Sequence, residues 1–221
     1  MRHLLKERER QLVTNKLNNY LKDEVRLILF TQEFECEYCN LTRSLAEELS
    51  AIDSRVRLEI YDLKADEDKA VRFRVDKVPA LLIHGRKEYK VRYFGVPSGY
   101  EFSALLDDII DVSRGETGLS STTKEQLRSV KRPVHIQVFV TPTCPYCPRA
   151  VRLAHQMAIE NENVMGDMIE SIEFPHLSTR YQVMAVPKVI INESFSFEGA
   201  LPEHLFLQYV MLAASENPLS K

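Results

Sequence analysis

The sequence of 221 residues predicts an α/β protein made of two tandem units, each with a mixed central sheet flanked by helices. Three observations predict this fold class. A Cys-x-x-Cys pair occurs twice, 108 residues apart; a Val-Pro pair follows each of them at the same distance; and strand-type and helix-type segments surround both copies in the same order. The chain is long enough for two domains of about 110 residues each.

Each copy contains the same succession of predicted elements. A run rich in branched and aromatic residues precedes each cysteine pair and predicts a strand, and an apolar-periodic helix follows it. A second strand, a further helix, a hairpin that ends at a glycine, and a closing helix come next. In the first copy these segments, apart from the further helix, are residues 25–30, 41–52, 55–63, 80–95 and 101–113. In the second copy they are residues 134–140, 149–160, 164–172, 188–199 and 203–214.

An additional amphipathic helix is predicted before the first copy. Its apolar stripe consists of Leu4, Leu5, Leu12, Val13 and Leu17. Because its polar face has mixed charge, we expect the stripe to pack in the core and not on a membrane.

The boundary between the two units is predicted in residues 113–133. Two glycines and a Ser/Thr cluster indicate a linker, and a short helix is expected after a cap at Thr122 or Thr123. We therefore divide the chain into a first half (residues 1–116) and a second half (residues 117–221).

The four cysteines of the chain all lie in the two pairs. The first pair is Cys36 and Cys39 in "CEYC", and the second is Cys144 and Cys147 in "CPYC". Each pair stands at the predicted start of a helix, where free backbone N–H groups and the helix dipole favour a thiolate. The second thiol is one helical turn further on, so each pair can form a reversible disulfide. We predict that Cys36 and Cys144 attack substrate disulfides and that Cys39 and Cys147 resolve the mixed disulfides.

Two prolines share their distance from the cysteine pairs. Pro79 and Pro187 each stand 43 residues after the first cysteine of their pair, and each follows a valine, Val78 or Val186. On base rates both peptide bonds would be trans, because cis X–Pro bonds are only about 5–6% of such bonds in folded proteins.

The doubled unit, with "CPYC" in its second copy and two matched prolines, resembles the glutaredoxin-like protein disulfide oxidoreductases of thermophilic archaea and bacteria. The resemblance covers nearly the whole chain and implies two thioredoxin-fold units. It also implies that Pro79 and Pro187 are cis-prolines beside the dithiols, and that the backbones of Val78 and Val186 pair with substrate peptide. The implied activity is reduction, formation and isomerisation of protein disulfides, with a thioredoxin reductase as electron donor.

The sequence departs from thioredoxins in two ways. It has no tryptophan, so Glu35 and Thr143 stand before the cysteine pairs. Phe30 and Val138 occupy the strand position where thioredoxin has a buried aspartate that manages protons. Glu59 and Asp62 on the second predicted strand are candidates to replace it.

The two pairs differ in charge. Glu33, Glu35 and Glu37 lie within three residues of Cys36, whereas Arg149 and Arg152 follow the second pair. Like charge raises a thiol pKa. We therefore predict that Cys144 is the more acidic thiol and that the second pair is the stronger oxidant. The residues between the cysteines are Glu37 and Tyr38 in the first pair and Pro145 and Tyr146 in the second; the tyrosines either present the motif or cover the helix start.

Several partners and sites are not expected. A net charge of −3 gives no reason to expect nucleic acid or an anionic membrane. The chain shows no Gly-rich phosphate loop, so we expect no cofactor other than the redox-active disulfides. The N-terminus lacks a secretory signal pattern, which favours the cytoplasm.

Two alternative interpretations remain open. Four cysteines in two pairs are also the ligand set of a structural zinc site, but 104 residues separate Cys39 from Cys144 and zinc pairs usually lie much closer in sequence, so we expect no metal. Alternatively, the chain is a client-binding module in which only "CPYC" is redox-active and the first pair is structural.

Overall fold

The structure is a computed structural model that describes residues 4–216. The elements of the first half are α1 (Glu7–Tyr20), β1 (Val25–Thr31), α2 (Cys39–Ile52), β2 (Val56–Asp62), α3 (Glu67–Phe73), β3 (Ala80–His84), β4 (Val91–Phe94) and α4 (Glu101–Arg114). Those of the second half are α5 (Ser121–Leu127), β5 (Val134–Val140), α6 (Cys147–Glu160), β6 (Val164–Glu170), α7 (Pro175–Arg180), β7 (Lys188–Ile191), β8 (Phe195–Glu198) and α8 (Glu203–Ser215). The predicted order of elements is present in both halves.

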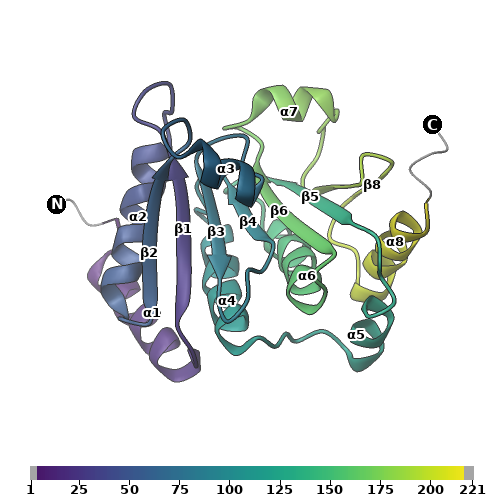
Figure 1. Cartoon of the computed structure of the whole chain (residues 1–221), viewed down its shortest axis with the longest axis horizontal. Helices are drawn as coiled ribbons and strands as arrows, with labels where there is room; N and C mark the ends of the chain where they lie inside the picture. Colours follow the sequence, from purple (N-terminus) through teal and green to yellow (C-terminus); the bar gives the residue numbers. More distant parts are fainter. Residues whose placement is uncertain (1–3, 217–221) are drawn as a thin grey trace.

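All these strands form one mixed sheet in the order β2-β1-β3-β4-β6-β5-β7-β8 (Figure 1). In each half the strand before the cysteine pair is central. It pairs parallel with the second strand and antiparallel with the first strand of the hairpin. The halves join where β4 pairs parallel with β6, from Val91 opposite Gly166 to Phe94 opposite Ile169. The repeat predicts two sheets, and the structure merges them into one.

Both faces of the sheet are covered by helices, as expected for strands that are apolar on both sides. Alternate residues of each strand belong to different cores: Val138 of β5 lies in one and Phe139 in the other. The first core includes residues of α1, α2, α4, α5, α6 and α8, and the second includes residues of α3 and α7. Figure 1 shows α2, α4 and α6 behind the sheet. Within residues 4–216, no helix has the length and apolar character needed to span a membrane.

Some element boundaries differ from those predicted. Helices α2 and α6 begin at Cys39 and Cys147, two residues before the apolar patterns that predict them. Pro148 fits this first turn, where a missing N–H costs no helical hydrogen bond. The cap of α5 is Ser120, whose hydroxyl accepts the Thr123 N–H, so the predicted cap at Thr122 or Thr123 is wrong.

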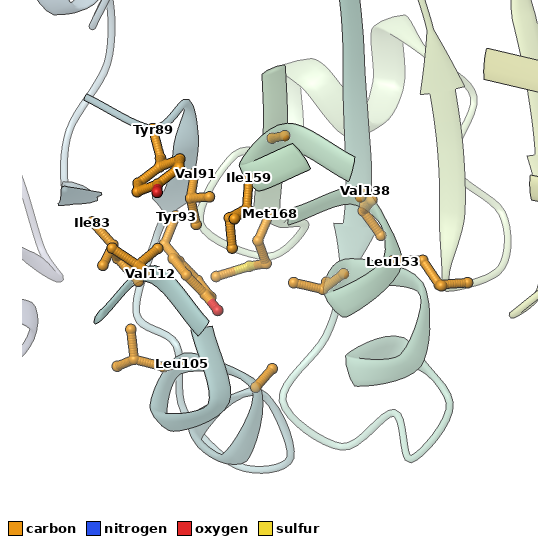
Figure 2. Packing of buried hydrophobic residues seen from close by; sticks show 14 of the residues in the cluster. Ile83, Tyr89, Val91, Tyr93, Leu105, Val112, Val138, Leu153, Ile159 and Met168 are labelled. Carbon is orange, nitrogen blue, oxygen red and sulfur yellow. The ribbon is translucent and has the colours of Figure 1, made fainter. Parts of the chain in front are cut away.

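The contact between the halves is extensive and buried. Helix α4 of the first half packs against α6 of the second, and Figure 2 shows side chains of both halves meeting there, with Tyr93 of β4 beside Met168 of β6. A β-carbon at Gly166 would lie 2.9 Å from the carbonyl oxygen of Ala154, so only glycine lets α6 approach β6 this closely. The buried Arg92 of β4 also pairs with Asp167 of β6 at 2.6 Å. The halves are therefore held by packing and by buried charge.

Candidate active site

Both cysteine pairs form disulfides at the first turn of a helix. Cys36–Cys39 precedes and begins α2, and Cys144–Cys147 precedes and begins α6, each with a Cα–Cα distance of 5.5 Å. Each disulfide follows a central strand of the sheet, β1 or β5, by a short loop. Among residues 4–216, no group of three or more His, Cys, Asp and Glu side chains is arranged to hold a metal ion. The spacing therefore places two separate dithiol sites at equivalent positions of the two halves.

The second pair is buried and hydrogen-bonded. Cys144 is 7% exposed and Cys147 is fully buried. The backbone N–H of Cys147 donates to the Cys144 sulfur at 3.1 Å, at the start of α6. A hydrogen bond and the positive end of a helix both stabilise negative charge on that sulfur. The geometry therefore favours a thiolate at Cys144 in the reduced protein.

Both Val-Pro peptide bonds are cis, as the resemblance implies and against the base rate. The carbonyl oxygen of Val186 lies 3.7 Å from the Cys144 sulfur, so the structure brings the second proline loop against the second pair. The glycines that end the hairpins form backbone hydrogen bonds with the prolines. Gly95 donates its N–H to the Pro79 carbonyl at 3.0 Å, and Gly199 donates to the Pro187 carbonyl at 2.8 Å.

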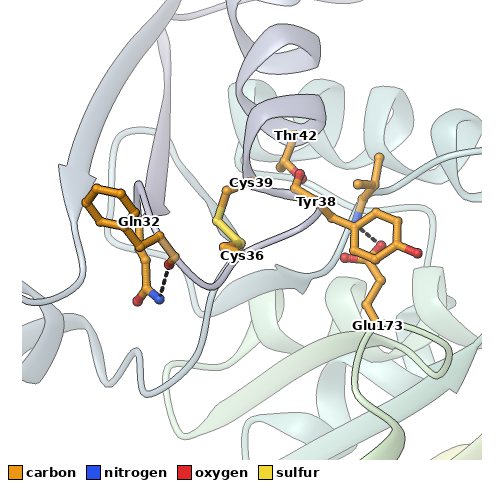
Figure 3. Close-up of a disulfide and its surroundings, with 8 residues drawn as sticks. Gln32, Cys36, Tyr38, Cys39, Thr42 and Glu173 are labelled. Carbon is orange, nitrogen blue, oxygen red and sulfur yellow. Dashed lines mark hydrogen bonds between the residues drawn. A yellow bond between two sulfur atoms is a disulfide. The ribbon is translucent and has the colours of Figure 1, made fainter.

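The first pair is more open. Cys36 is half-buried, Cys39 is buried, and the preceding loop exposes Glu33, Phe34 and Glu35. In the part of the chain that the structure describes, no hydrogen bond to the Cys36 sulfur is present. The Glu37 carboxylate, then burial and then Glu173 and Glu170 of the second half, raise the pKa of Tyr38. Figure 3 shows one of these acids, Glu173, near the Tyr38 ring.

Arg152 does not act as the sequence leads us to expect. Its guanidinium is mostly buried and pairs with Asp108 and Asp111 of α4. Because two carboxylates compensate this charge, Arg152 is not free to favour the Cys144 thiolate, and that expectation is wrong. Arg149 remains exposed on the first turns of α6.

Glu59 and Asp62 are also engaged elsewhere. Glu59 accepts hydrogen bonds from Arg26 at 3.2 Å and from the Tyr61 hydroxyl at 2.8 Å. Asp62 accepts the backbone N–H groups of the turn that follows β2. Both carboxylates are held by these partners, and their exchange of protons with the dithiols stays a prediction.

A different buried acid stands at the start of α4. Glu101, the first residue of α4, is 1% exposed, and both of its carboxylate oxygens lack a partner. Burial, and secondarily Asp108, raises its pKa to about 8. The N–H of the preceding Tyr100 donates to the carbonyl of Pro142, in the loop that carries Cys144.

The helix pairing places Glu101 beside the start of α6. Asp108 of α4 accepts a hydrogen bond from His155 of α6 at 2.6 Å. Glu101 precedes Asp108, and Cys147 precedes His155, by about two helical turns each. Tyr100 before α4 contacts Pro142 before α6, and Thr117 after α4 contacts Glu160 at the end of α6. The helices therefore run in the same direction, and Glu101 lies at about the level of Cys147. The sequence does not single out Glu101, because an acid in the first turn of a helix is ordinary.

Two dithiols at helix starts, each in a half that carries a cis-proline, define a thiol–disulfide oxidoreductase of the thioredoxin fold. Residues 134–211 match the family model described as Thioredoxin domain. The crystal structure of a protein disulfide oxidoreductase from Aeropyrum pernix is 34% identical, with a TM-score of 0.90, and the match covers 96% of this chain and 95% of that one. The chain therefore belongs to the protein disulfide oxidoreductase family.

Two curated relatives are longer proteins. An NADH dehydrogenase from Bacillus subtilis is 25% identical over 182 residues, and the F component of alkyl hydroperoxide reductase from Staphylococcus epidermidis is 25% identical over 186 residues. The matches cover 81% and 80% of this chain but only 34% of each relative.

Proposed function

We propose that this chain reduces, forms and isomerises disulfides in protein substrates through both dithiols. The observation that carries the proposal is the arrangement at the second pair. There the Cys147 N–H donates to the Cys144 sulfur, and the carbonyl of Val186 lies 3.7 Å from the same sulfur. A stabilised thiolate next to a cis-proline loop can attack a disulfide presented along that loop.

The first step is attack on the substrate. The Cys144 thiolate bonds to one sulfur of the substrate disulfide, the substrate S–S bond breaks, and the other substrate sulfur leaves as a thiolate that takes a proton from water. Val186 and Pro187 line the site where the substrate backbone lies. In the first half Cys36 attacks, and Val78 and Pro79 take the corresponding place.

The second step releases the product. The Cys147 thiol passes its proton to the Glu101 carboxylate and attacks Cys144, the mixed disulfide breaks, and the second substrate sulfur leaves as a thiolate that takes the proton from Glu101. Two electrons and two protons have moved from the enzyme dithiol to the substrate. Cys39 resolves the intermediate on Cys36 in the same way. Run in reverse, the same steps oxidise a substrate dithiol.

The surroundings of the second pair support protein substrates. Tyr146, between the two cysteines, is 69% exposed, and Met184, two residues before Val186, is 89% exposed. Exposed apolar side chains beside a reactive sulfur suit apolar polypeptide segments, which unfolded proteins present.

The electron donor we propose is a thioredoxin reductase. The two curated relatives are named as an NADH dehydrogenase and a component of alkyl hydroperoxide reductase, which supports a nicotinamide-dependent reductase as the source of electrons. We place this exchange in the cytoplasm. We also propose that the domain boundary lies between residues 116 and 117, because α4 ends at Arg114 and α5 begins at Ser121.

Insulin reduction tests the proposal. Wild type, Cys36→Ser and Cys144→Ser would be compared with dithiothreitol as reductant, with Cys36→Ser/Cys144→Ser as the control. We expect each single variant to retain turnover above the double variant, and Cys144→Ser to lose more. Equal turnover of wild type and the double variant would exclude the proposed function.

In a second candidate function, only the Cys144–Cys147 pair is redox-active. Two observations favour it: the Thioredoxin domain model matches only residues 134–211, and the hydrogen bond that stabilises the Cys144 sulfur has no counterpart at Cys36 among the described residues. In that case Cys36→Ser would turn over insulin as fast as wild type, and Cys144→Ser would match the double variant.

A further inference from the structure

A carboxylate of the second half reaches the surroundings of the first pair. Glu173 lies in the turn between β6 and α7, and its Oε1 accepts the backbone N–H of Val96 at 2.8 Å. A β-carbon at the adjacent Gly95 would lie 3.0 Å from the Glu173 carboxyl carbon, and the φ of Gly95 is +93°. Glycine at this position therefore leaves the space that Glu173 occupies.

Figure 3 shows Glu173 beside the ring of Tyr38, one of the two residues between Cys36 and Cys39. The loop of residues 95–100, whose Val96 N–H donates to Glu173, also contacts the loop before Cys144 through the hydrogen bond from Tyr100 to Pro142. Glu173 thus contacts a segment of the first half that lies between the two dithiols.

The groups that face Glu173 are acidic. Its backbone N–H donates to Oε2 of Glu170, at the end of β6, at 2.7 Å. Glu37, in the first cysteine pair's loop, adds a further negative charge. The second carboxylate oxygen of Glu173 is buried without a partner, as is Oε1 of Glu170. Burial first, then the charge of Glu170 and Glu37, raises the pKa of Glu173 to about 7.

The charge of Glu173 acts on a residue inside the first Cys-x-x-Cys motif. Glu37, burial, Glu173 and Glu170 together raise the pKa of the Tyr38 hydroxyl. A negative charge that disfavours a phenolate next to Cys36 also disfavours a thiolate there.

We propose that Glu173 is a positioning residue of the first dithiol: its charge disfavours the Cys36 thiolate, and its hydrogen bond to Val96 fixes that charge beside Tyr38. The second half thereby regulates the first site, and the effect switches on as Glu173 ionises through neutral pH. The consequence for turnover rests on the proposed function, whereas the effect on the thiol does not.

The test is the pH profile of Cys36 alkylation by iodoacetamide, resolved by peptide mapping, in full-length Cys144→Ser/Cys147→Ser protein with and without Glu173→Gln. Glutamine keeps an oxygen for the Val96 N–H and removes the charge. Above pH 7.5 we expect alkylation of Cys36 to be about threefold faster in the Glu173→Gln protein. Below pH 6, where Glu173 is protonated, we expect the two profiles to coincide.

Two controls separate this role from a structural one. Glu162→Gln removes an exposed acid of the same half and is expected to leave the Cys36 profile unchanged. In Cys36→Ser/Cys39→Ser protein, Glu173→Gln is expected to leave Cys144 alkylation unchanged. The proposal is overturned if Glu173→Gln has no effect on Cys36 above pH 7.5, or if it shifts Cys36 and Cys144 equally. Because alkylation requires no turnover, an inactive first site would contradict the proposed function and leave this result standing.

Discussion

The first and second dithiols share a backbone framework but not an environment. Both disulfides stand at the start of a helix with the same Cα–Cα distance, and both halves carry a cis Val-Pro bond. Cys144 is buried and hydrogen-bonded by the helix, whereas Cys36 is half-buried among acids. The duplication therefore preserves the backbone geometry of the two dithiols more closely than the charges around them, and those charges set the redox potential of each pair.

The unusual acids of the two sites come from the opposite half. Glu101 belongs to the first half and lies level with Cys147, and Glu173 belongs to the second half and lies beside Tyr38. Each half alone would therefore lack the acid that lies near its own dithiol. The shared sheet and the α4–α6 contact are what bring them together.

The largest expected effect concerns the pH dependence of stability. The carboxyl of Glu101 titrates near its ordinary pKa of 4.5 in the unfolded chain and near pH 8 in the folded protein. Its contribution to stability is therefore complete below pH 4.5 and is lost as the pH rises to 8, by up to ~5 kcal/mol. Urea unfolding of Glu101→Gln and wild type between pH 4.5 and 8 measures it.

The expected result is that wild type loses stability relative to Glu101→Gln across this range. Glu173→Gln provides a second, smaller case. The stability contribution of Glu173 is lost by about pH 7, and it is smaller than that of Glu101 because Glu173 is more exposed. A constant difference between wild type and Glu101→Gln at every pH would contradict the raised pKa.

Removing the Asp108 carboxylate is expected to cost ~3–5 kcal/mol of unfolding free energy. Asp108→Ala leaves the buried His155 ring without its carboxylate partner and leaves the buried Arg152 with Asp111 alone. Asp107→Ala is the matched control, since Asp107 is only half-buried and its ion pair with Lys16 contributes at most about 1 kcal/mol. Urea unfolding at pH 7 measures both.

Because Arg152 and His155 lie on α6, we expect Asp108→Ala to change the alkylation rate of Cys144 more than that of Cys36. An equal change at both cysteines would contradict this expectation.

Glu101→Gln is also expected to slow turnover at the second site by ~100-fold at pH 7, the range typical of a lost general acid–base group. Insulin reduction in a Cys36→Ser background isolates that site, and Glu125→Gln, an exposed acid of α5, is the control. In the direction in which Cys147 must lose its proton, the wild-type rate should rise with pH through 8. A variant with wild-type rate and pH profile would show that Glu101 does not take the proton.

The repeat makes the fold and both dithiols predictable. Strand and helix periodicities, the two cysteine pairs and the spacing to Pro79 and Pro187 are local features of the sequence, and each appears where it is expected. The single sheet is not predictable in this way, since β4 and β6 carry Arg92 and Asp167 in their middles and these charges become compatible with burial only when the strands pair.

The acids escape prediction for the same reason. Glu101 and Arg152 lie 51 residues apart in the sequence, and their environments depend on how α4 packs on α6. Residue spacing within one half carries no information about a contact made between halves. Sequence neighbours such as Arg152 therefore look available to Cys144 although Asp108 and Asp111 neutralise the charge.

The smallest expected effect is the difference in redox potential between the pairs. The backbone hydrogen bond at Cys144 stabilises a thiolate, while acids near Cys36 oppose one, and a stabler thiolate makes a more oxidising disulfide. We expect the second pair to be more positive by at least ~30 mV, which corresponds to ~1.4 kcal/mol in a two-electron couple. Equilibration of Cys36→Ser/Cys39→Ser and Cys144→Ser/Cys147→Ser proteins in glutathione buffers, followed by alkylation and mass spectrometry, measures each pair alone.

Since Arg152 is neutralised, the difference in redox potential must come from the helix start and the acids, and Glu37→Gln should reduce this difference. Equal potentials, or a more positive first pair, would mean that burial of Cys144 outweighs its hydrogen bond.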